Sequence, residues 1–415
     1  MRIAVVGSGI AGMATAWQLA REHSVVLFEA DSRLGGHTHT HTVEREGRSF
    51  QVDSGFIVHN PENYPLLTAM FRELGVETQP TTMSFSVHSE RTGLEYNAGT
   101  LNGLFCQRRN LLRPRFYRMV ADILRFYRES PALLQGDAQG PALGDYLREH
   151  RYSPMFIDEH LIPMASALWS SPSDRVLQFP ARYLVQFMAN HHMLSADARP
   201  TWRVVKGGSS AYIRALESRW RVEARLSSAV QSVRRVEGGV EITTPHYAET
   251  FDRAVLACHS DQALKLLDQP SEREREVLGA IRYQPNETVL HTDARLLPKN
   301  PRAWAAWNAH IPASPSADCT VSYCMNLLQG LTSREPFVVT LNRTAAIDPG
   351  KVIARMRYAH PEYTHASVAA QARRDEINGV DRIWYAGAYW GWGFHEDGIR
   401  SAIDVVRALG VRWPQ

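Results

Sequence analysis

Residues 2–12 have the sequence RIAVVGSGIAG, and this stretch decides the fold of the amino-terminal part of the chain. Its first five residues, 2–6, are a short apolar and β-branched run of the kind that forms a buried parallel strand. A glycine-rich turn follows, made of Gly7, Ser8, Gly9, Ile10, Ala11 and Gly12. A helical pattern then continues over residues 13–21. A strand, a glycine-rich turn and a helix in this order predict a dinucleotide-binding unit.

Each glycine of the turn has a physical role in such a unit. Gly7 permits the tight turn, Gly9 lets a pyrophosphate approach the backbone, and Gly12 lets the helix pack closely on the strand. The helix N-terminus then presents unpaired N–H groups and its positive dipole end to the phosphates. A second predicted strand over residues 24–28 ends at Glu29, where a carboxylate accepts hydrogen bonds from an adenosine ribose.

The composition indicates an ordinary globular protein. The 415 residues are 44% hydrophobic and 21% charged, which suggests two or three domains and excludes a disordered chain. A net charge of +3 is too small to indicate nucleic acid binding, and no uncharged apolar run reaches the ~18 residues of a membrane span. The cysteines show no metal-ligand spacing, so we expect reduced thiols and a cytoplasmic protein: Cys106, Cys258, Cys319 and Cys324.

A second glycine pair follows Glu29 and Ala30 in the run Arg33-Leu34-Gly35-Gly36. With it the sequence resembles the FAD-binding proteins of the amine oxidase, protoporphyrinogen oxidase and phytoene desaturase superfamily. Their fingerprint is the first glycine motif, a ribose-binding acid and then Arg-x-Gly-Gly. The resemblance implies FAD as the cofactor and places His37, directly after the second glycine pair, near its phosphates.

The resemblance extends along most of the chain. Asp53-Ser54-Gly55-Phe56-Ile57 is similar to the segment that passes near the flavin ring, and Val230 lies in a run, 229–233, similar to the strand that holds adenine. Residues 251–257 resemble a strand that returns to the nucleotide domain. Residues 383–388 and 395–399 resemble the closing FAD motif of these proteins. The resemblance implies that Gly387 lies at the pyrophosphate and that the helix beginning at 395 points its N-terminus at the flavin carbonyl O2. It also implies that Asp397, Gly398 and Ile399 bind the cofactor. No cysteine lies in this motif, so we expect noncovalent FAD.

The resemblance implies an α/β fold, with a Rossmann-type FAD-binding domain and an inserted α+β substrate domain. We expect the FAD-binding domain over 1–80, 200–270 and 375–415, and the substrate domain over 81–199 and 271–374. Residues 113–194 have a mostly helical pattern and 281–345 alternate like strands, as a helical part and an antiparallel sheet require.

Three residues are candidates for a polar group next to the flavin: His291, His395 and Glu396. In the amine oxidases a strand near this position carries a lysine that holds water against flavin N5. No lysine stands between Lys265 and Lys299 here, and Thr288 or His291 fills the region instead. A histidine on a strand is also often structural, and the missing lysine weakens the specific interpretation as an amine oxidase.

Three further patterns leave alternatives open. In 37–42, HTHTHT, an extended segment would put three imidazoles on one side, as a metal site or as a polar strand near the nucleotide; we predict no metal. Six aromatic residues near the closing motif are core residues or walls of a cavity facing the flavin: Trp384, Tyr385, Tyr389, Trp390, Trp392 and Phe394.

Residues 108–128 hold seven arginines and one acid, Asp122. Apolar residues at helical spacing are expected on one face (Phe116, Met119, Val120, Ile123, Leu124, Tyr127), with Arg115, Arg118, Asp122 and Arg125 on the other. This is a packed helix with a solvated basic face, or a surface for anionic lipid head groups at the inner membrane surface or for an anionic substrate.

Three functions are compatible with the sequence. The first is hydride removal from a carbon of an apolar, lipid-like substrate, as in dehydrogenation or desaturation. Three runs support it because they resemble a bacterial amine oxidase-like group often encoded beside cyclopropane-fatty-acid synthase relatives: 83–87, 290–293 and 393–398. The second is oxidation of a primary or secondary amine, and the third is FAD binding without turnover. The sequence does not identify the electron acceptor.

Overall fold

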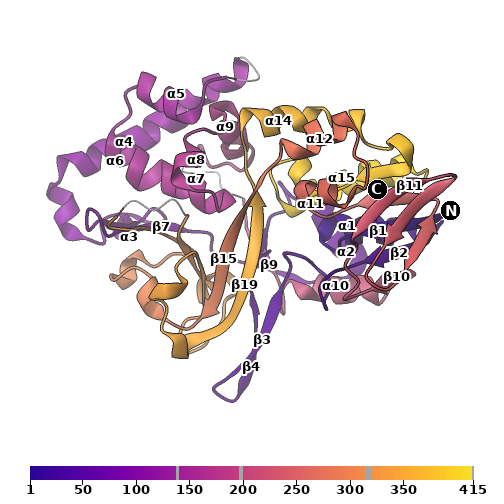
Figure 1. Cartoon of the computed structure of the whole chain (residues 1–415). Coiled ribbons are helices and arrows are strands. Elements are labelled where there is room, and N and C mark those ends of the chain that lie inside the picture. The colour runs from indigo at the N-terminus through magenta and orange to yellow at the C-terminus, as the bar shows by residue number, and fades with distance from the viewer. Residues whose placement is uncertain (137–139, 196–199, 315–318, 414–415) are drawn as a thin grey trace.

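The computed structural model describes residues 1–136, 140–195, 200–314 and 319–413 (Figure 1). The chain begins with β1 (Arg2–Val6), α1 (Ile10–Leu19) and β2 (Ser24–Phe28), as predicted. The helix starts three residues earlier than the periodicity indicated, because Gly9 is its extended N-cap residue and Ile10 is already helical.

A five-stranded parallel sheet contains both of these strands, in the order β10-β2-β1-β14-β20. The other members are β10 (Val222–Arg225), β14 (Arg253–Leu256) and β20 (Ile383–Tyr385). Alternate residues of β1 enter different cores: Ile3 and Val5 pack with α1, while Ala4 and Val6 pack on the opposite face. A sheet that is buried on both faces explains why these strands are continuous apolar runs.

Helices and a small sheet cover the two faces of this sheet. One face holds α1, α2 (Pro65–Leu74), α10 (Ser210–Glu217) and α15 (His395–Ala408). The other holds α11 (Ser260–Leu266), α12 (Glu272–Gly279), α14 (His365–Ala372) and the antiparallel strands β11 (Ser232–Val236), β12 (Gly239–Thr243) and β13 (Ala248–Phe251). The predicted α/β Rossmann-type fold is confirmed.

A seven-stranded mixed sheet forms a second body, in the order β19-β15-β18-β17-β16-β7-β8. Its strands are β7 (Phe85–Ser89), β8 (Glu95–Asn97), β15 (Tyr283–His291), β16 (Trp307–Ile311), β17 (Val321–Cys324), β18 (Val338–Leu341) and β19 (Val352–Pro361), with α13 (Met325–Gln329) after β17. The long strands β15 and β19 pair from Tyr283 and Pro361 to His291 and Val352. Figure 1 shows this ribbon running between the two bodies.

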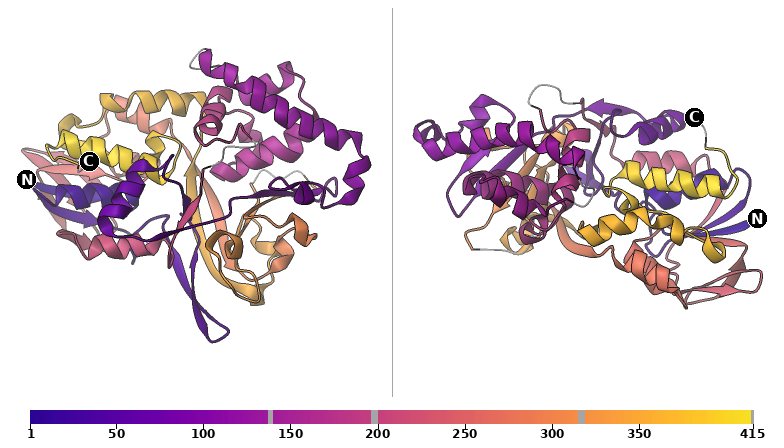
Figure 2. Two further views of the ribbon diagram at one scale, coloured as in Figure 1. Left: turned by 180° about the vertical axis from the view of Figure 1, so that it is seen from behind. Right: turned by 90° about the horizontal axis from the view of Figure 1, so that it is seen from above.

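The predicted helical part covers the β7 and β8 end of that sheet (Figure 2). Its α-helices are α3 (Leu101–Leu104), α4 (Pro114–Glu129), α5 (Leu143–Glu149), α6 (Pro154–Phe156), α7 (Ile162–Trp169), α8 (Ser173–Val176) and α9 (Ala181–Asn190). Short 3-10 turns, η1 (Arg108–Leu112) and η2 (Ser130–Gln135), flank α4, and a π-helical turn, η3 (Ile157–Leu161), precedes α7. The predicted domain boundaries stay a prediction, and the one between 199 and 200 borders residues outside the described part.

Two small sheets join the bodies. β3 (Thr40–Arg45) and β4 (Arg48–Asp53) form a hairpin, and β5 (Val58–His59), β9 (Arg203–Val205) and β6 (Thr78–Pro80) form a short sheet. Two predicted strands differ in extent. Val230 precedes β11, and 251–257 is divided between β13 and β14 at Asp252, whose backbone N–H donates to the Arg2 carbonyl oxygen. In the described part of the chain, no helix is long and apolar enough to cross a membrane.

A buried carboxylate joins α15 to α2. Glu396 lies in the first turn of α15, and its Oε1 and Oε2 atoms each accept a hydrogen bond of 3.0 Å from the backbone N–H groups of Leu66 and Leu67. These N–H groups belong to the first turn of α2, where no partner exists within the helix. The carboxylate therefore acts as an N-cap supplied from a neighbouring helix.

Replacing Glu396 with alanine should lower the free energy of unfolding by about 2 kcal/mol or more, because two hydrogen bonds to a charged group are lost. Urea unfolding at saturating FAD measures this change. The matched control is Glu237→Ala in the exposed turn between β11 and β12. Equal stability losses in both variants would contradict the capping role.

Candidate cofactor and substrate site

A cavity of about 1290 Å³ is lined by both bodies of the fold and by the helical part. Its nucleotide end lies at the carboxyl ends of parallel strands, where the loops after β1, β2, β14 and β20 meet. This is the edge at which open α/β sheets bind ligands. Most of the predicted cofactor-binding residues line it: Gly7, Gly9, Ile10, Ala11, Glu29, Ala30, Arg33, Gly35, Gly36, His37, Gly55, Phe56, Ile57, Val230 and Gly387.

The glycine-rich turn fits a dinucleotide. Gly7 has φ +101°, which L side chains rarely adopt, and a Cβ on Gly12 would collide with the Gly7 carbonyl oxygen. A Cβ on Gly9, by contrast, would meet no atom within 4 Å. The backbone at the N-terminus of α1 is thus accessible from the cavity, as phosphate binding at a helix N-terminus requires.

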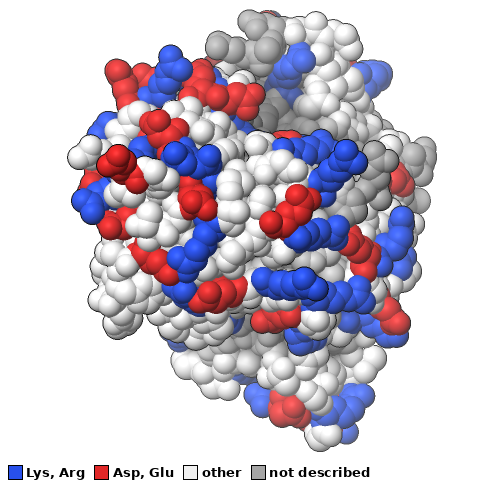
Figure 3. All heavy atoms as spheres, turned by 90° about the vertical axis from the view of Figure 1, so that its right-hand side faces the viewer, with Lys and Arg blue, Asp and Glu red and all other residues white. Residues whose placement is uncertain are grey.

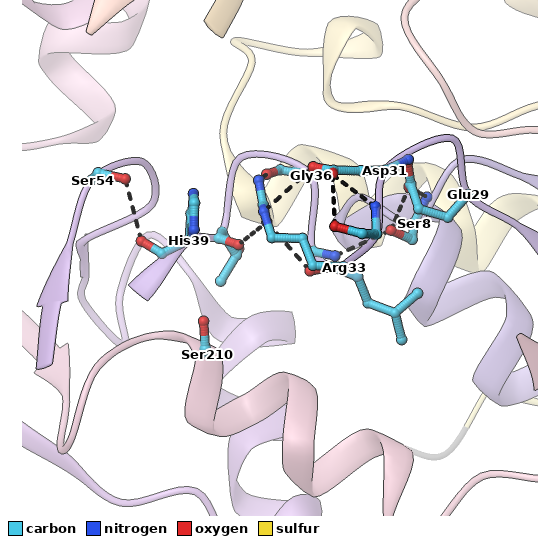
Figure 4. Close-up of polar contacts among 12 residues, drawn as sticks. Ser8, Glu29, Asp31, Arg33, Gly36, His39, Ser54 and Ser210 are labelled. Atoms are coloured by element: carbon cyan, nitrogen blue, oxygen red, sulfur yellow. Dashed lines mark hydrogen bonds and ion pairs between the residues drawn. The ribbon is translucent and has the colours of Figure 1, made fainter. Parts of the chain in front are cut away.

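Glu29 is held in place by the same turn (Figure 4). Its Oε2 atom accepts hydrogen bonds from Ser8, at 2.9 Å from the backbone N–H and 2.5 Å from the hydroxyl, and its Oε1 atom accepts one from the Asp31 N–H at 2.8 Å. A carboxylate oxygen has more than one acceptor site, so Glu29 can still accept from ribose hydroxyls.

Arg33 fixes the second glycine pair. Its guanidinium donates to the carbonyl oxygens of Gly36 at 2.8 Å and Thr38 at 3.0 Å (Figure 4). A Cβ on Gly36 would stand only 3.1 Å from the Cα of Gly9. Arg33 therefore fixes the conformation of the second glycine-rich segment. The Gly35 N–H joins this segment to the first turn, since it donates to the Ser8 carbonyl oxygen at 3.1 Å.

His395 lines the cavity at the start of α15. Its ring stacks on Phe56 with centroids 3.7 Å apart, and its Nε2 atom lies 3.0 Å from the Thr38 hydroxyl and 3.3 Å from the Tyr212 hydroxyl. Burial, followed by repulsion from His37, lowers the pKa of His395 to about 3. The ring is neutral at pH 7, and its Nε2 atom is engaged by the Thr38 and Tyr212 hydroxyls.

His291 and Glu396 do not line the cavity, in contrast to the prediction that they stand beside the flavin. His291 lies at the far end of β15 and is fully buried; its Nε2 atom is 2.8 Å from the Thr340 hydroxyl and its Nδ1 atom accepts from the Asp293 N–H at 3.0 Å. The strand is longer than the cavity wall, so only its first half faces the site. Glu396 caps α2, as described above.

Four predicted cofactor residues support the site from behind the wall: Gly12, Asp397, Gly398 and Ile399. Asp397 accepts from the N–H groups of Trp392 at 3.0 Å and Phe394 at 3.1 Å, which fixes the loop before α15. A Cβ on Gly398 would approach Ile10 to 2.7 Å, so this glycine lets α15 pack closely on α1.

The three histidines of the 37–42 motif do not gather on one side. His39 and His41 are adjacent, with ring centroids 3.9 Å apart, but His37 precedes β3 and lies against Tyr358 and His360. His37 directly follows the turn at Gly35 and Gly36, both with positive φ, and β3 begins only at Thr40, so His37 does not take part in the alternation of the strand. Among the described residues no group of three His, Cys, Asp or Glu side chains has a metal-binding arrangement.

The aromatic residues near the closing motif divide into two groups. Tyr389, Trp392 and Phe394 line the cavity, whereas Trp384, Tyr385 and Trp390 do not. Tyr385 donates to Glu274, and the Trp390 indole N–H donates to the Tyr385 carbonyl oxygen at 3.1 Å. Three of the six aromatic residues are therefore cavity walls, and the other three lie outside the cavity wall.

Cys258 lines the nucleotide end of the cavity. Burial raises the pKa of its thiol to about 12, so the thiol stays protonated and unreactive at pH 7. A reactive thiolate, which a covalent link to the flavin would need, is thus not provided by this residue.

Several wall residues were not predicted from the sequence. They include Trp307 on β16, Tyr323 on β17, and Arg357, Tyr358 and His360 on β19, whereas Thr288 on β15 was one of the two residues expected near the flavin. Strand alternation indicated that some residues of 281–345 share a face, but β19 pairs with β15 across about 70 residues, and no local signal shows that pairing.

The family model for flavin containing amine oxidoreductases matches residues 10–296, which is more than half of the chain. The chain belongs to this family of FAD-dependent oxidoreductases.

Individual relatives are more distant. A Mycobacterium tuberculosis protein assigned as a flavin-containing monoamine oxidase, AofH, is 27% identical over 256 residues, 58% of this chain and 53% of its own. The chain spans about half or less of the length of the curated relatives it matches. Two solved structures share the fold: a protein assigned as a protoporphyrinogen oxidase from Exiguobacterium sp. 255-15 (TM-score 0.70, 17% identity, 98% of each chain) and a fatty acid isomerase from P. acnes (TM-score 0.68, 16% identity, 99% of each chain).

Replacing Glu29 with alanine should weaken FAD binding at least tenfold, because each hydrogen bond to a charged acceptor contributes about 1.5–3 kcal/mol and a tenfold change corresponds to about 1.4 kcal/mol. FAD fluorescence on release from the diluted holoprotein measures the dissociation constant. Glu22→Ala, at an exposed carboxylate outside the cavity wall, is the control. An unchanged dissociation constant in Glu29→Ala would contradict the assignment of the ribose site.

Proposed function

We propose that this FAD-dependent oxidoreductase removes a hydride from a carbon of an apolar, lipid-like substrate. The observation that carries the proposal is the composition of the cavity away from its nucleotide end. Its walls there are mainly apolar and aromatic: Met83, Phe85, Met164, Leu168, Trp169, Phe187, Met193, Trp307, Tyr323, Leu341 and Trp392. A buried alkyl chain gains about 0.8 kcal/mol per methylene in such surroundings.

The charges around the cavity are distributed unevenly. The carboxylates among its described wall residues are Glu29, Asp31 and Asp261, and all three follow strands of the nucleotide sheet. A cationic substrate at the apolar end would therefore lack a carboxylate partner, and a buried charge without a partner is strongly unfavourable. This distribution favours a neutral, apolar substrate.

The bound flavin supplies a two-electron acceptor for the hydride. The apolar walls hold the substrate carbon and exclude water from it. The amine oxidases resembled by the sequence carry a lysine on a strand near this position, where this chain has Thr288 and His291. Of these two residues only Thr288 lines the cavity, and its buried hydroxyl has no hydrogen-bond partner among the described residues. No charged group on that strand is therefore available to the substrate carbon, which fits a reaction without a lysine-bound water.

A second candidate is oxidation of a primary or secondary amine. The family to which the chain belongs and the similarity to AofH favour it. Aromatic side chains such as Tyr358 and Trp392 offer faces that can stabilise a cationic nitrogen. A third candidate is FAD binding without turnover.

Anaerobic mixing of the holoprotein with a lipid extract should bleach the flavin absorbance, whereas a panel of primary and secondary amines should not. The reason is that only an apolar chain finds complementary walls at the substrate end. Bleaching by amines alone would overturn the proposal in favour of amine oxidation. No bleaching by either set would favour the noncatalytic alternative.

We also propose that residues 101–128 contact an anionic membrane surface. The predicted helix is confirmed as α4, but its faces differ from the prediction. Asp122 is buried and accepts from the Ser153 N–H at 2.9 Å, because it caps the turn before α6, while Leu124 is 56% exposed. Arg125 is paired with Asp122 and Glu129 and stacks on Tyr152.

Large apolar side chains are exposed on this segment beside arginines. Leu112 is 88% exposed and Leu101 is 77% exposed, and Leu111 and Tyr117 are about half exposed. Arg115 and Arg118 are exposed and have no ion-pair partner among the described residues. Exposed leucines next to unpaired arginines are the combination that interfacial segments use on anionic lipids.

The opposite end of the molecule has a different surface. Figure 3 shows positive and negative side chains intermixed over the face near β10 and β11. Arginines there are paired, as in Arg225 with Glu223 and Arg234 with Glu241. The unpaired arginines and exposed leucines of residues 101–128 are therefore not a general property of the surface.

Liposome flotation should show binding to vesicles that contain phosphatidylglycerol and weaker binding to pure phosphatidylcholine. Changing Arg115 and Arg118 to glutamine should reduce binding to the anionic vesicles about tenfold or more, at about 1 kcal/mol per arginine. Leu111→Ser with Leu112→Ser should reduce it as well, and Leu226→Ser, at a partly exposed leucine near β10, should not. Equal flotation of all variants would contradict the proposed contact between residues 101–128 and an anionic membrane.

A further inference from the structure

Three histidines from distant parts of the chain meet in the middle of the cavity wall, and we call them the imidazole cluster: His37, His259 and His360. The His37 ring centroid is 5.6 Å from that of His259 and 5.5 Å from that of His360. His37 follows the second glycine pair, His259 is the N-cap residue of α11, and His360 lies near the end of β19. All three line the cavity.

The imidazole cluster lies beside the N-terminus of α1. His37 directly follows Gly36, which packs on Gly9, and His259 follows Ala257 and Cys258, whose backbone atoms lie 3.0 Å from the Cβ position of Gly7. At the other side, His37 is close enough to His395 to lower the pKa of that ring. The cluster therefore stands between the two glycine-rich turns and His395, beside the N-terminus of α1, which is suited to receive the phosphates of a dinucleotide.

The hydrogen bonds of β15 determine which nitrogen of His360 carries the hydrogen. The Glu287 N–H donates to Oδ1 of Asn342 at 2.9 Å, so Nδ2 of Asn342 donates to Oδ1 of Asn286 at 2.7 Å. Nδ2 of Asn286 must then donate to Nδ1 of His360, 3.1 Å away. The hydrogen of the neutral His360 ring is therefore on Nε2, which has no protein partner among the described residues.

His37 has the complementary arrangement. Its Nε2 atom lies 3.1 Å from the carbonyl oxygen of Ala359, which can only accept, so Nε2 carries the hydrogen. Nδ1 of the neutral ring then has a lone pair and can donate to an anion only after it gains a proton. His360 can thus donate to a phosphate oxygen as it stands, and His37 can do so once protonated.

We propose that the imidazole cluster binds the phosphates of FAD and takes up about one proton when they bind. The inference depends on the FAD dependence of the family and not on the substrate proposed above. A phosphate placed among the three rings supplies the negative charge that they lack, and the added proton turns His37 into a second donor.

The titration of the three rings supports the proposal. Burial, followed by repulsion from His259, lowers the pKa of His37 to about 3. Burial and repulsion from His37 lower that of His360 to about 3, and burial and repulsion from His360 lower that of His259 to about 4. A phosphate anion opposes both causes, since it favours the charged form of a nearby imidazole.

The groups packed around the imidazole cluster do not supply that negative charge. On α11, Asp261 and Lys265 line the cavity near His259, but neither of them shifts the pKa of any of the three rings. Arg33 lowers the pKa of His37 further. Burial raises the pKa values of Tyr283, which stacks on His259, and of Tyr358, which lies against His37, so both phenols are neutral at pH 7. His395 is neutral as well. The phosphates are therefore the counter-ion on which protonation of the cluster depends.

The sign of the pH dependence follows from linkage. The complex binds more protons than the free protein, so FAD affinity is highest at low pH and falls as pH rises toward the raised pKa of the complex. For one proton the fall is up to tenfold per pH unit, and the affinity becomes independent of pH above that value. The phosphates of FAD stay ionised throughout, so the proton is taken up by the protein.

The test is a titration of the full-length apoprotein with FAD between about pH 5 and about pH 8, with folding checked by circular dichroism at each pH. The dissociation constant of the wild type should rise with pH by up to tenfold per unit. His37→Gln, which removes the group that takes up the proton, should bind FAD more weakly at low pH and show a flatter profile. His360→Gln, which removes a neutral donor, should bind FAD more weakly across the whole range. His246→Gln, at an exposed histidine outside the cavity wall, is the control and should keep the wild-type profile.

Riboflavin, which has no phosphate, is the second probe and needs no variant. Its dissociation constant should not change over this range. A pH-independent affinity of the wild type for FAD would overturn the proposal. So would the same pH dependence for riboflavin, since the titrating group would then face the flavin, or a wild-type profile in a folded His37→Gln protein.

Discussion

The close approach of the N-terminus of α1 to the ends of the parallel strands is the constraint on which the site depends. Gly12 permits it, because any Cβ there would collide with the Gly7 carbonyl oxygen. Three other parts of the chain contact this turn or the first residues of α1. Ser8 of the turn orients Glu29 and accepts from the Gly35 N–H, Gly36 packs on Gly9, and Gly398 lets α15 pack against Ile10. The result is a fixed set of backbone dipoles and one carboxylate that suit a dinucleotide.

The paired strands β15 and β19 extend this site into a second chemical environment. They belong to the seven-stranded sheet, are paired from Tyr283 and Pro361 onward, and carry Thr288 and Arg357 along the wall toward an apolar end. The cavity therefore combines a polar half that holds the cofactor with an apolar half that excludes water. That division, and not any single reactive side chain, is what makes hydride transfer from a buried carbon chemically reasonable here.

The sequence predicted the local features well. β1, β2 and the glycine turn depend on neighbours in the chain, and Glu29 has a position that its motif defines. The roles of His291, Glu396 and Asp122 were not predictable in the same way, because each depends on a tertiary partner: Thr340, the start of α2, and the Ser153 N–H. His360 joins His37 only through the long-range pairing of β19, and no motif near residue 360 indicates it.

The most direct test of the account is a crystal structure of the holoprotein with a long-chain fatty acid added. The account predicts that the FAD phosphates lie at the N-terminus of α1 beside His37, and that the alkyl chain lies among Met83, Met164 and Trp307. An alkyl chain that is absent from this end of the cavity while an added amine occupies it would contradict the proposed substrate. Phosphates placed away from the first glycine turn would contradict the whole account.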